Sequence, residues 1–379
     1  MRTDAASAPS SAASLATMAD RCVQCGLCLP HCPTYRLDGI ESESPRGRIA
    51  YIKAVALGAL APTTVGDLHL DHCLGCRRCE AVCPAGVEMD RLLVDARTAQ
   101  FQRRALPRPI RFRLALLSLP RPMRAALALY RIAFGWLPSG LRPLPRPPRN
   151  VGLPPTSSQD EKVALFAGCV ARIYESETRV ALAKLLAATG VRATLPGNQG
   201  CCGTAAAHAG DSKQAERLRQ SNRHAFAGHD RVLSLASGCQ QDLTDGLAGI
   251  AKVEDAVAFL ETRGDRLNFR SAAGRIVALH LPCTQRVLKS ETALRRLLAK
   301  VPDLRVVELP DSGCCGAAGL HMLAEPGRAA RLRSPVLAAL EGCGASELLS
   351  ANIGCRLHLA NGSKIPVRHP IEFLAEHLS

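Results

Sequence analysis

The stretch RCVQCGLCLPHCPTYR, Arg21–Arg36, places four cysteines within eleven residues and follows the last of them with a proline. Four thiolates this close could hold one metal ion, one iron–sulfur cluster, or three corners of a cluster whose fourth corner lies elsewhere. A second stretch, DHCLGCRRCEAVCPAG, Asp71–Gly86, repeats the spacing C-x2-C-x2-C-x3-C-P. Two such runs are typical of paired [4Fe–4S] clusters in which the last cysteine of each run ligates the other cluster.

The spacing therefore predicts two [4Fe–4S] clusters with crossed ligands. The expected ligands are Cys22, Cys25, Cys28 and Cys83 for cluster 1, and Cys73, Cys76, Cys79 and Cys32 for cluster 2. Gly26 and Gly75 would let backbone N–H groups approach the sulfurs. A pair of zinc sites is the alternative, but zinc would leave the C-x2-C-x2-C triplets followed by Cys-Pro without a use.

The segment between the two motifs is too long for a compact two-hairpin ferredoxin. It contains PRGRIAYIKAVALGAL, Pro45–Leu60, whose apolar residues follow a helical period. We therefore predict a helical two-cluster domain over residues 19–100, preceded by a disordered tail over residues 1–18. Arg46 and Arg48 would favour the reduced state of a nearby cluster if they face it; an exposed, solvated pair is the alternative.

The second half of the chain contains an internal duplication. KVALFAGC matches RIVALHLPC, LPGNQGCCG matches LPDSGCCG, and VLSLASGC matches LLSANIGC. Apolar runs that end at cysteines alternate with helix-like stretches (179–189, 215–227 and 292–300), which predicts two α/β units, 161–270 and 271–379, with parallel strands. Each unit offers four sulfurs at one edge of its sheet: Cys169, Cys201, Cys202 and Cys239 in the first, and Cys283, Cys314, Cys315 and Cys355 in the second.

These motifs resemble the glycolate oxidase iron–sulfur subunit family, in which two cluster motifs flank a PRGRI segment, here Pro45–Ile49, and precede two cysteine-rich CCG domains. CCG domains are shared with heterodisulfide reductases, anaerobic glycerol-3-phosphate dehydrogenases and lactate-utilisation iron–sulfur proteins. The likeness covers residues 20–100 and 160–370, and the order of modules, with CPTY and PRGRI, favours the glycolate oxidase subunit. The resemblance implies an α-helical ferredoxin-type domain followed by two duplicated α/β CCG domains.

The two CCG units depart from the family pattern at one position. The pattern ends in C-x2-C, but Asp242 and His358 stand where the last cysteine is expected. Either residue could ligate iron or zinc, or could stay a solvated or supporting neighbour. Each unit could therefore hold a further iron–sulfur cluster, a zinc ion or only free thiols. The nearby His208, His280 and His321 are expected to be hydrogen-bonded structural residues.

A basic connector is expected between these parts, over residues 101–160. No acidic residue occurs between Asp95 and Asp160, whereas Arg97–Arg149 contains twelve arginines and many prolines. A stripe in Met123–Leu137 could lie in a membrane interface, with arginines attracted to anionic lipid. A linker with a docking helix is the alternative, and a nucleic-acid patch is disfavoured because no reading helix or stacking aromatic accompanies the arginines.

Composition and the N-terminal sequence disfavour several other classes of protein. The chain has 48 Lys and Arg against 33 Asp and Glu, 17 cysteines, and only 3% aromatic residues, which disfavours binding of single-stranded nucleic acid. The first residues lack the apolar core of a secretory signal, so the clustered cysteines are expected to be ligands rather than disulfides. No apolar run reaches the roughly 18–20 residues needed to span a bilayer. We expect a cytoplasmic protein, or one held on the inner face of the membrane.

The sequence contains neither a G-x-G-x-x-G fingerprint nor a P-loop, the usual signs of a nucleotide or flavin site. The resemblance implies an electron-transfer subunit of a flavin-dependent 2-hydroxy-acid dehydrogenase, with glycolate as substrate, FAD on a partner subunit and a quinone-type acceptor. Substrate oxidation is then expected on the partner, and no catalytic residue is assigned here. The alternatives are a thiol–disulfide catalyst like the CCG-containing heterodisulfide reductases, or the iron–sulfur subunit of a lactate or glycerol-3-phosphate dehydrogenase.

Overall fold

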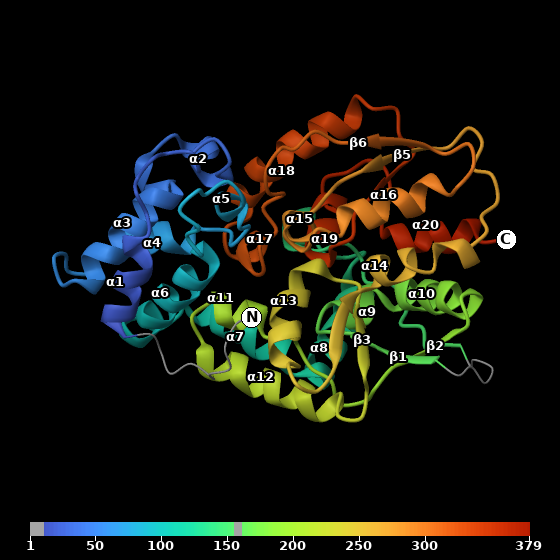
Figure 1. Ribbon diagram of the computed structural model, residues 1–379, viewed down its shortest axis with the longest axis horizontal. Coiled ribbons are helices and arrows are strands. Elements are labelled where there is room, and N and C mark those ends of the chain that lie inside the picture. Colours follow the sequence, from blue (N-terminus) through green and yellow to red (C-terminus); the bar gives the residue numbers. More distant parts are fainter. Residues whose placement is uncertain (1–10, 155–160) are drawn as a thin grey trace.

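The computed structural model describes residues 11–154 and 161–379. Figure 1 shows a helical N-terminal domain in blue beside two α/β units, of which the first runs from green to yellow and the second from orange to red. The helices of the N-terminal domain are α1 Ala12–Asp20, α2 Pro33–Asp38, η1 Glu41–Glu43, α3 Pro45–Ala56, α4 Thr64–Asp71, α5 Arg78–Ala81 and α6 Met89–Arg103.

The N-terminal domain has its own apolar core. Leu92 and Leu93 of α6 are fully buried, and Ile49 and Ile52 of α3 pack in the same cluster together with Leu15 of α1. Burial of these side chains explains why α1 forms inside the segment predicted to be disordered. That prediction is wrong for residues 12–18, which are helical, and residues 1–10 lie outside the described residues.

Helix α3 is shorter than its sequence pattern predicts. It ends at Ala56, because the chain then turns through Gly58, whose φ of +71° lies in the left-handed region that favours glycine. Leu60, which the pattern assigns to the apolar stripe of this helix, follows the turn and is exposed.

Each of the two later units contains a four-stranded parallel sheet. The first unit contains β1 Glu161–Leu165, α9 Ala171–Tyr174, α10 Ser176–Ala188, β2 Val191–Thr194, α11 Thr204–His208, α12 Ser212–Ala225, β3 Arg231–Ser234, α13 Ser237–Gly246, β4 Lys252–Asp255, α14 Ala256–Glu261 and η3 Gly264–Arg266. The second contains β5 Ile276–Leu279, α15 Cys283–Leu288, α16 Glu291–Ala299, β6 Arg305–Glu308, α17 His321–Ala324, α18 Pro326–Glu341, β7 Glu347–Leu349, α19 Ile353–Ala360, β8 Val367–Arg368 and α20 Pro370–His377.

The two sheets have the same strand order, β2-β1-β3-β4 and β6-β5-β7-β8, and every pairing within them is parallel. This arrangement agrees with the duplication and the parallel strands predicted from the sequence. The three helix-like stretches predicted in these units correspond to α10, α12 and α16. Because parallel strands end at the same edge of a sheet, the loops after β1, β2 and β3 carry the cysteines of the first unit to one place.

The two α/β units face each other with reciprocal helix contacts. Helix α10 of the first unit packs against α20 of the second, and α14 of the first packs against α16 of the second. Leu185, Leu186, Phe373 and Leu374 belong to one buried cluster that spans both units. A buried ion pair, Arg356 with Glu175, also crosses this contact. The two units therefore fold around a shared core.

The basic connector forms two helices, α7 Arg108–Ser118 and α8 Pro120–Ala133, and the short helix η2 Ser139–Leu141. Met123 and Leu127 of the predicted stripe are buried against Ile173 of the first α/β unit, so this face of α8 docks on the chain itself. Residues 155–160 of the connector lie outside the described residues. Over the described ranges, no helix combines the length and the apolar character needed to cross a bilayer.

Candidate iron–sulfur sites

The first cavity of the N-terminal domain is lined by four of the predicted ligands. Cys22, Cys25, Cys28 and Cys83 all face it, together with Arg46. The loop between α1 and α2 wraps round this cavity through Gly26, whose φ is +83°, and a Cβ there would lie 3.0 Å from the Arg46 Nη1. Burial raises the pKa of the Cys28 thiol. A bound metal centre would offset this effect of burial on the pKa, because its positive charge stabilises the thiolate, which is the form that binds iron.

The second cavity is lined by the other four predicted ligands, Cys32, Cys73, Cys76 and Cys79. Cys32 caps the N-terminus of α2, and Pro33 opens that helix, so the crossing ligand is fixed at a helix end. Gly75, with φ of +58°, is required here, because a Cβ at this position would lie 2.5 Å from the His208 Cε1. Cys79 lines both cavities and each of the other seven thiols lines one, and the donor set of each cavity fits one [4Fe–4S] cluster with the crossed ligands.

The two arginines of the PRGRI segment have different surroundings. Arg46 lines the first cavity and donates from Nη1 to the Gln24 carbonyl oxygen at 3.1 Å. Arg48 lines the second cavity and is fully buried, with an exposed fraction of 1%. The predicted alternative, an exposed and solvated pair, is therefore wrong for Arg48. Each guanidinium group already pairs with a carboxylate, Arg46 with Glu41 and Arg48 with Glu43, both at 2.6 Å.

The four thiols predicted for the first α/β unit come together at the carboxyl edge of its sheet. The Cys201 thiol lies within hydrogen-bonding reach of Cys169 and Cys202, and Cys202 within reach of Cys239. Hydrogen bonds from Cys201 and then Cys239 hold the pKa of Cys202 well below its usual range. The doublet is followed by Gly203, whose φ is +98°. Four converging thiols with one favoured thiolate form a donor set suited to iron or zinc.

The second α/β unit repeats this convergence. Cys283, Cys314 and Cys315 are in hydrogen-bonding contact in sequence, and the Cys315 and Cys355 Sγ atoms lie 3.2 Å apart. The hydrogen bond with Cys314, followed by burial, raises the pKa of Cys283 well above its usual range. Both CCG turns thus bring together the four sulfurs that the duplication predicts. The second unit therefore also has a donor set suited to iron or zinc.

The residues that replace the fourth family cysteine behave differently from each other. The Thr204 Oγ1 donates to the Asp242 Oδ2 at 2.8 Å and contacts the Cys202 Sγ at 3.2 Å, so Asp242 reaches the thiol group through a hydroxyl. Burial raises the pKa of Asp242. His358 instead bonds through Nε2 to the Ala329 carbonyl oxygen at 3.0 Å. Asp242 therefore supports its thiol group, and His358 is tied to the backbone.

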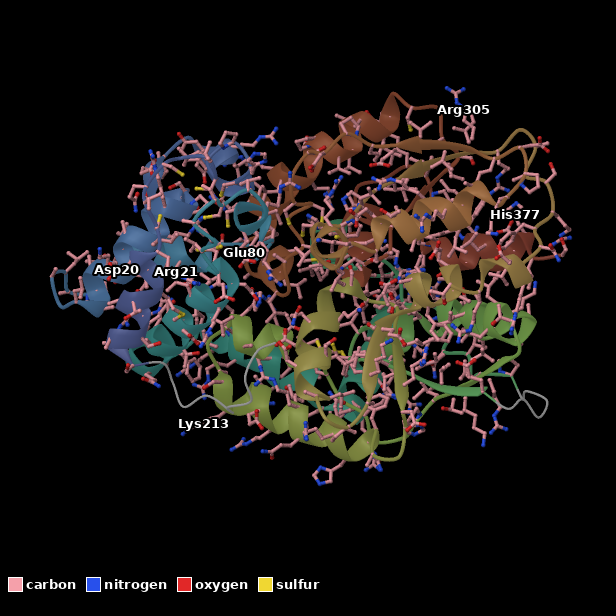
Figure 2. All side chains as sticks on the ribbon, viewed as in Figure 1. Asp20, Arg21, Glu80, Lys213, Arg305 and His377 are labelled. Carbon is pink, nitrogen blue, oxygen red and sulfur yellow. The ribbon has the colours of Figure 1, made fainter. Side chains whose placement is uncertain are left out.

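The N-terminal domain and the second α/β unit meet at cysteines. Cys76 of the second cavity packs in one cluster with Cys283 and Cys314. Helices α5 and α15, which carry Cys79 and Cys283, are in contact, and the Arg78 Nη2 bonds to the Asp311 Oδ2 at 2.7 Å across the same junction. Sulfur atoms accordingly gather in the blue domain and along its border with the second unit in Figure 2. The two cavities and this thiol group form a continuous series, because Cys79 lines both cavities.

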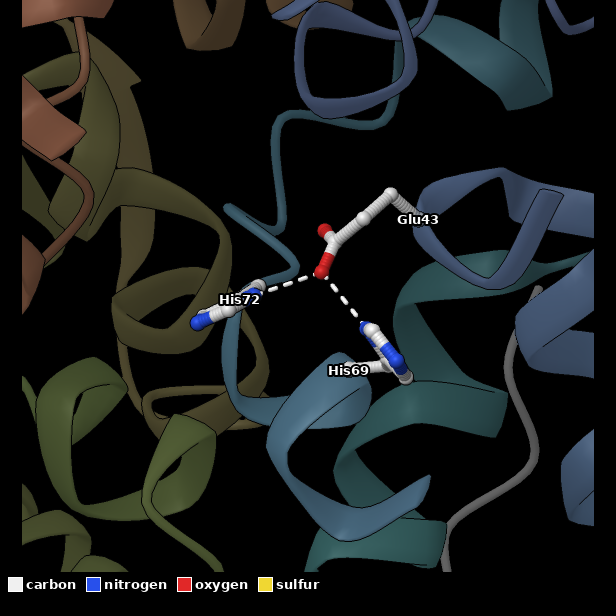
Figure 3. A group of neighbouring side chains, drawn as sticks. All are labelled: Glu43, His69 and His72. Carbon is white, nitrogen blue, oxygen red and sulfur yellow. Dashed lines mark hydrogen bonds and ion pairs between the residues drawn. The ribbon is translucent and has the colours of Figure 1, made fainter. Parts of the chain in front are cut away.

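Sequence analysis missed a buried carboxylate beside the second cavity. The Glu43 Oε1 accepts hydrogen bonds from His69 Nδ1 at 2.7 Å and from His72 Nδ1 at 2.5 Å (Figure 3). Its Oε2 accepts from Arg48 at 2.6 Å and from Arg328 at 2.8 Å. The sequence signal was His69 and His72 placed just before Cys73. Glu, His and His could bind a metal ion in other surroundings, but the two arginines already balance this carboxylate, so we assign it no metal.

The pKa of Glu43 reflects these partners. Burial alone would raise it, but hydrogen bonds from His72 and His69 and the charges of Arg48 and Arg328 outweigh burial and lower the pKa to about 2. Because Arg328 lies in the first turn of α18, this carboxylate also joins the N-terminal domain to the second α/β unit.

Comparison with known proteins agrees with this arrangement. Residues 18–87 match the 4Fe-4S dicluster domain family, and residues 163–244 and 277–360 match the cysteine-rich domain family called CCG. The glycolate oxidase iron-sulfur subunit of Escherichia coli (strain K12) is 33% identical over 94% of this chain and 93% of that protein. The chain belongs to the glycolate oxidase iron–sulfur subunit family. The probable subunit of the same name from Bacillus subtilis (strain 168) is 30% identical over 90% of this chain and 88% of that protein.

Membership of the glycolate oxidase iron–sulfur subunit family confirms the predicted resemblance and the iron–sulfur character of the chain. It also shows the coarse architecture, a 4Fe-4S dicluster domain followed by two CCG domains. A more distant relative is one subunit of the dihydromethanophenazine:CoB--CoM heterodisulfide reductase of Methanosarcina barkeri (strain Fusaro / DSM 804), 26% identical over 95% of this chain and 94% of that protein. The chain is thus an iron–sulfur protein of oxidoreductase complexes.

Proposed function

We propose that the chain is the electron-relay subunit of a flavin-dependent 2-hydroxy-acid dehydrogenase, with glycolate oxidised to glyoxylate on a partner subunit. The observation that carries the proposal is the continuous series of thiol groups, in which Cys79 lines both cavities and Cys76 packs against Cys283. Names of relatives that are glycolate oxidase iron-sulfur subunits support the substrate class. In this proposal, Cys22, Cys25, Cys28 and Cys83 hold cluster 1, and Cys73, Cys76, Cys79 and Cys32 hold cluster 2.

The proposed reaction requires two chains, one that oxidises the substrate and one that transfers the electrons. Oxidation of a 2-hydroxy acid releases two electrons, whereas iron–sulfur clusters accept one electron each, so a flavin that takes a pair and releases single electrons is needed upstream. We place the FAD on the partner subunit. The residues of this chain place Arg46 at the first cavity and Arg48 at the second, and they bring the thiols of the second CCG unit into one packed cluster with Cys76.

The relay predicts a specific spectroscopic result. The chain is purified anaerobically together with its flavin subunit, and iron, sulfide and zinc are measured before glycolate is added. We expect about eight irons per chain from two [4Fe–4S] clusters, and EPR signals of reduced clusters after glycolate. More iron would place a further cluster in a CCG unit. The chain without its flavin subunit is the control and should not be reduced by glycolate.

Three outcomes would count against this proposal in different ways. A purified chain that contains zinc but no sulfide would refute the electron-relay proposal. Reduction of the clusters by lactate or glycerol 3-phosphate but not by glycolate would favour the iron–sulfur subunit of a lactate or glycerol-3-phosphate dehydrogenase. Oxidation of the reduced clusters by a heterodisulfide, with cleavage into two thiols, would favour the thiol–disulfide catalyst, a function supported by the heterodisulfide reductase relative.

The surface of the connector supports peripheral attachment to an anionic membrane. Leu129, Ile132 and Trp136 are exposed at helical spacing, with Trp136 84% exposed, and Phe112 of α7 is also exposed. This is not the stripe that the sequence pattern favoured, because Met123 and Leu127 are buried. Exposed arginines of α7 and α8, with no acidic residue between Asp95 and Asp160, match the charge of acidic phospholipid.

We predict that replacing Trp136 and Ile132 with serine weakens binding to vesicles that contain acidic phospholipid. Each side chain would lose about 2 kcal/mol of apolar transfer, so the partition coefficient should fall by more than tenfold. Sedimentation with vesicles at low and high salt measures this. The control for helix stability is the serine variant of Tyr130 on the same helix, whose hydroxyl donates to the Leu144 carbonyl oxygen at 2.5 Å. Equal sedimentation of wild type and variant, or none by wild type with any lipid, would refute surface attachment.

A further inference from the structure

A cavity of about 400 Å³ lies where the N-terminal domain, both CCG units and the connector meet. Its walls come from the end of α4, from α6, from Ala105–Ile110 of the connector, from α11 and from the loop that leads into α17. The size is that of a site for a small organic ligand. Most of its wall is apolar, with Leu68, Phe101, Leu106, Ile110 and Leu320 among the lining residues.

Three polar atoms in the wall of this cavity have no hydrogen-bond partner. They are the Arg97 Nε, the Gln100 Oε1 and the His321 Nε2, all buried. Other atoms of these side chains are well engaged: the Arg97 Nη2 donates to the Cys73 carbonyl oxygen at 2.8 Å, and the Gln100 Nε2 donates to the Asp71 Oδ1 at 3.0 Å. Buried polar atoms are seldom left unpaired, so one donor and two acceptors round one cavity indicate a ligand with both kinds of group.

The cavity lies beside the cysteines of the second cluster cavity and beside the CCG turns of both α/β units. His72, which lines it, precedes Cys73, and His208 of α11 lies against Gly75. The His321 Nδ1 bonds to the carbonyl oxygen of Gly316, the residue that follows Cys315, at 3.0 Å. Burial lowers the pKa of His321 to about 4, so the ring is neutral, Nδ1 carries the proton, and Nε2 is an acceptor.

Neither guanidinium group of the wall is free to bind a small carboxylic acid in the two-pronged way that such a ligand favours. Both groups are already engaged, Arg104 with Asp71 at 2.6 Å and Arg97 with four backbone carbonyl oxygens. A flat apolar ring with oxygens at two ends fits better. Phe101, Ala105 and Leu106 also line a neighbouring hollow towards the connector, whose walls include Phe112 and Leu114 of α7 together with Arg103, Arg108 and Arg111.

We propose that this cavity binds the ring of a quinone, with Arg97 donating to one carbonyl oxygen and His321 accepting from the hydroxyl formed at the other. The inference rests on the proposed relay and names its acceptor site. Reduction of the quinone to the hydroquinone takes two electrons, delivered singly as the reduced relay is reoxidised, and two protons from water. Both carbonyl oxygens become hydroxyls, and no other co-reactant is needed.

The test uses the full chain loaded with its clusters and decylubiquinone as the probe. Ala205→Phe fills the cavity from α11, and Ala227→Phe adds the same ring at an exposed position outside it. Because the added ring takes up space that the ligand needs, the Kd for decylubiquinone should rise about tenfold or more in Ala205→Phe and stay unchanged in Ala227→Phe. Loss of the hydrogen bond from the hydroxyl in His321→Ala should raise the Kd for the reduced probe, decylubiquinol, about fivefold and leave the Kd for decylubiquinone unchanged.

Two further measurements separate this site from the relay itself. Cluster EPR spectra and reoxidation by ferricyanide, which needs no apolar cavity, should be the same in all variants, so a misfolded variant is recognised. Binding of decylubiquinone that survives unchanged in Ala205→Phe, together with binding of decylubiquinol that survives unchanged in His321→Ala, would overturn the quinone site while leaving the relay intact. Clusters that the flavin subunit cannot reduce would overturn the relay whether or not the quinone binds.

Discussion

Replacing Cys83 with serine should remove the cluster of the first motif, although Cys83 belongs to the second. The reason is the shape of the cavities: Cys83 lines the cavity of Cys22, Cys25 and Cys28, and it does not line the cavity of Cys32. Serine is a much weaker ligand for iron than thiolate. We expect iron to fall from about eight to about four per chain, and one of two sets of cluster EPR signals to disappear.

The matched control for this substitution is Cys343→Ser. Cys343 lies outside both cavities, and its thiol donates to the Leu340 carbonyl oxygen at 3.0 Å. Its replacement should leave iron content and EPR spectra unchanged. The reciprocal variant, Cys32→Ser, should remove the other cluster. If Cys83→Ser retained both sets of signals, or lost the set that Cys32→Ser also loses, the crossed assignment would be wrong.

Cysteine spacing predicted much of this fold because it encodes short-range geometry. The C-x2-C-x2-C runs wrap within a few residues, so the three thiols of each run could be grouped without knowledge of the fold. The duplication predicted the two α/β units. The apolar runs that end at cysteines predicted parallel strands and the sheet edge at which the cysteines meet. The contacts of Cys201 with Cys169 and of Cys315 with Cys355 follow from the same pattern.

Features that depend on contacts between distant segments could not be predicted in the same way. The pattern of Pro45–Leu60 continues past Ala56, and only Gly58 shows where the helix ends. The apolar stripe makes α8 amphipathic, and an amphipathic helix can pack on a membrane or on the protein itself. The sequence therefore did not show that Met123 packs against Ile173. Helix α1 forms because α3 and α6 cover its apolar side chains, and no local signal states this.

The largest expected effect on stability comes from Glu43→Gln. Glu43 is 1% exposed, and its carboxylate pairs with Arg48 at 2.6 Å and with Arg328 at 2.8 Å. The amide would leave the buried Arg48 guanidinium without its counter-ion, whereas Arg328 would keep Asp38 at 2.5 Å. Removing one partner of a buried ion pair costs about 3–5 kcal/mol, and this loss should appear as a lower midpoint of denaturant unfolding of the cluster-loaded chain.

Glu41→Gln is the control for Glu43→Gln. Glu41 also pairs with an arginine, Arg46 at 2.6 Å, but its side chain is 49% exposed. Exposed pairs contribute about 0–1 kcal/mol, so this variant should unfold close to wild type. A similar midpoint for Glu43→Gln and Glu41→Gln would show that the buried group of charges does not stabilise the junction.

The pH dependence gives Glu43 a signature that a purely steric effect would not have. Its pKa is lowered from 4.5 to about 2 in the folded chain, so the stabilising contribution is present above pH 4.5 and is lost as the pH falls towards 2. Between pH 7 and pH 4, wild type should lose about 1 kcal/mol more than Glu43→Gln, because the amide does not titrate. Anaerobic unfolding curves at the two pH values measure the difference. A gap between the two proteins that stays constant with pH would mean that packing, rather than the ionised carboxylate, joins the N-terminal domain to α18.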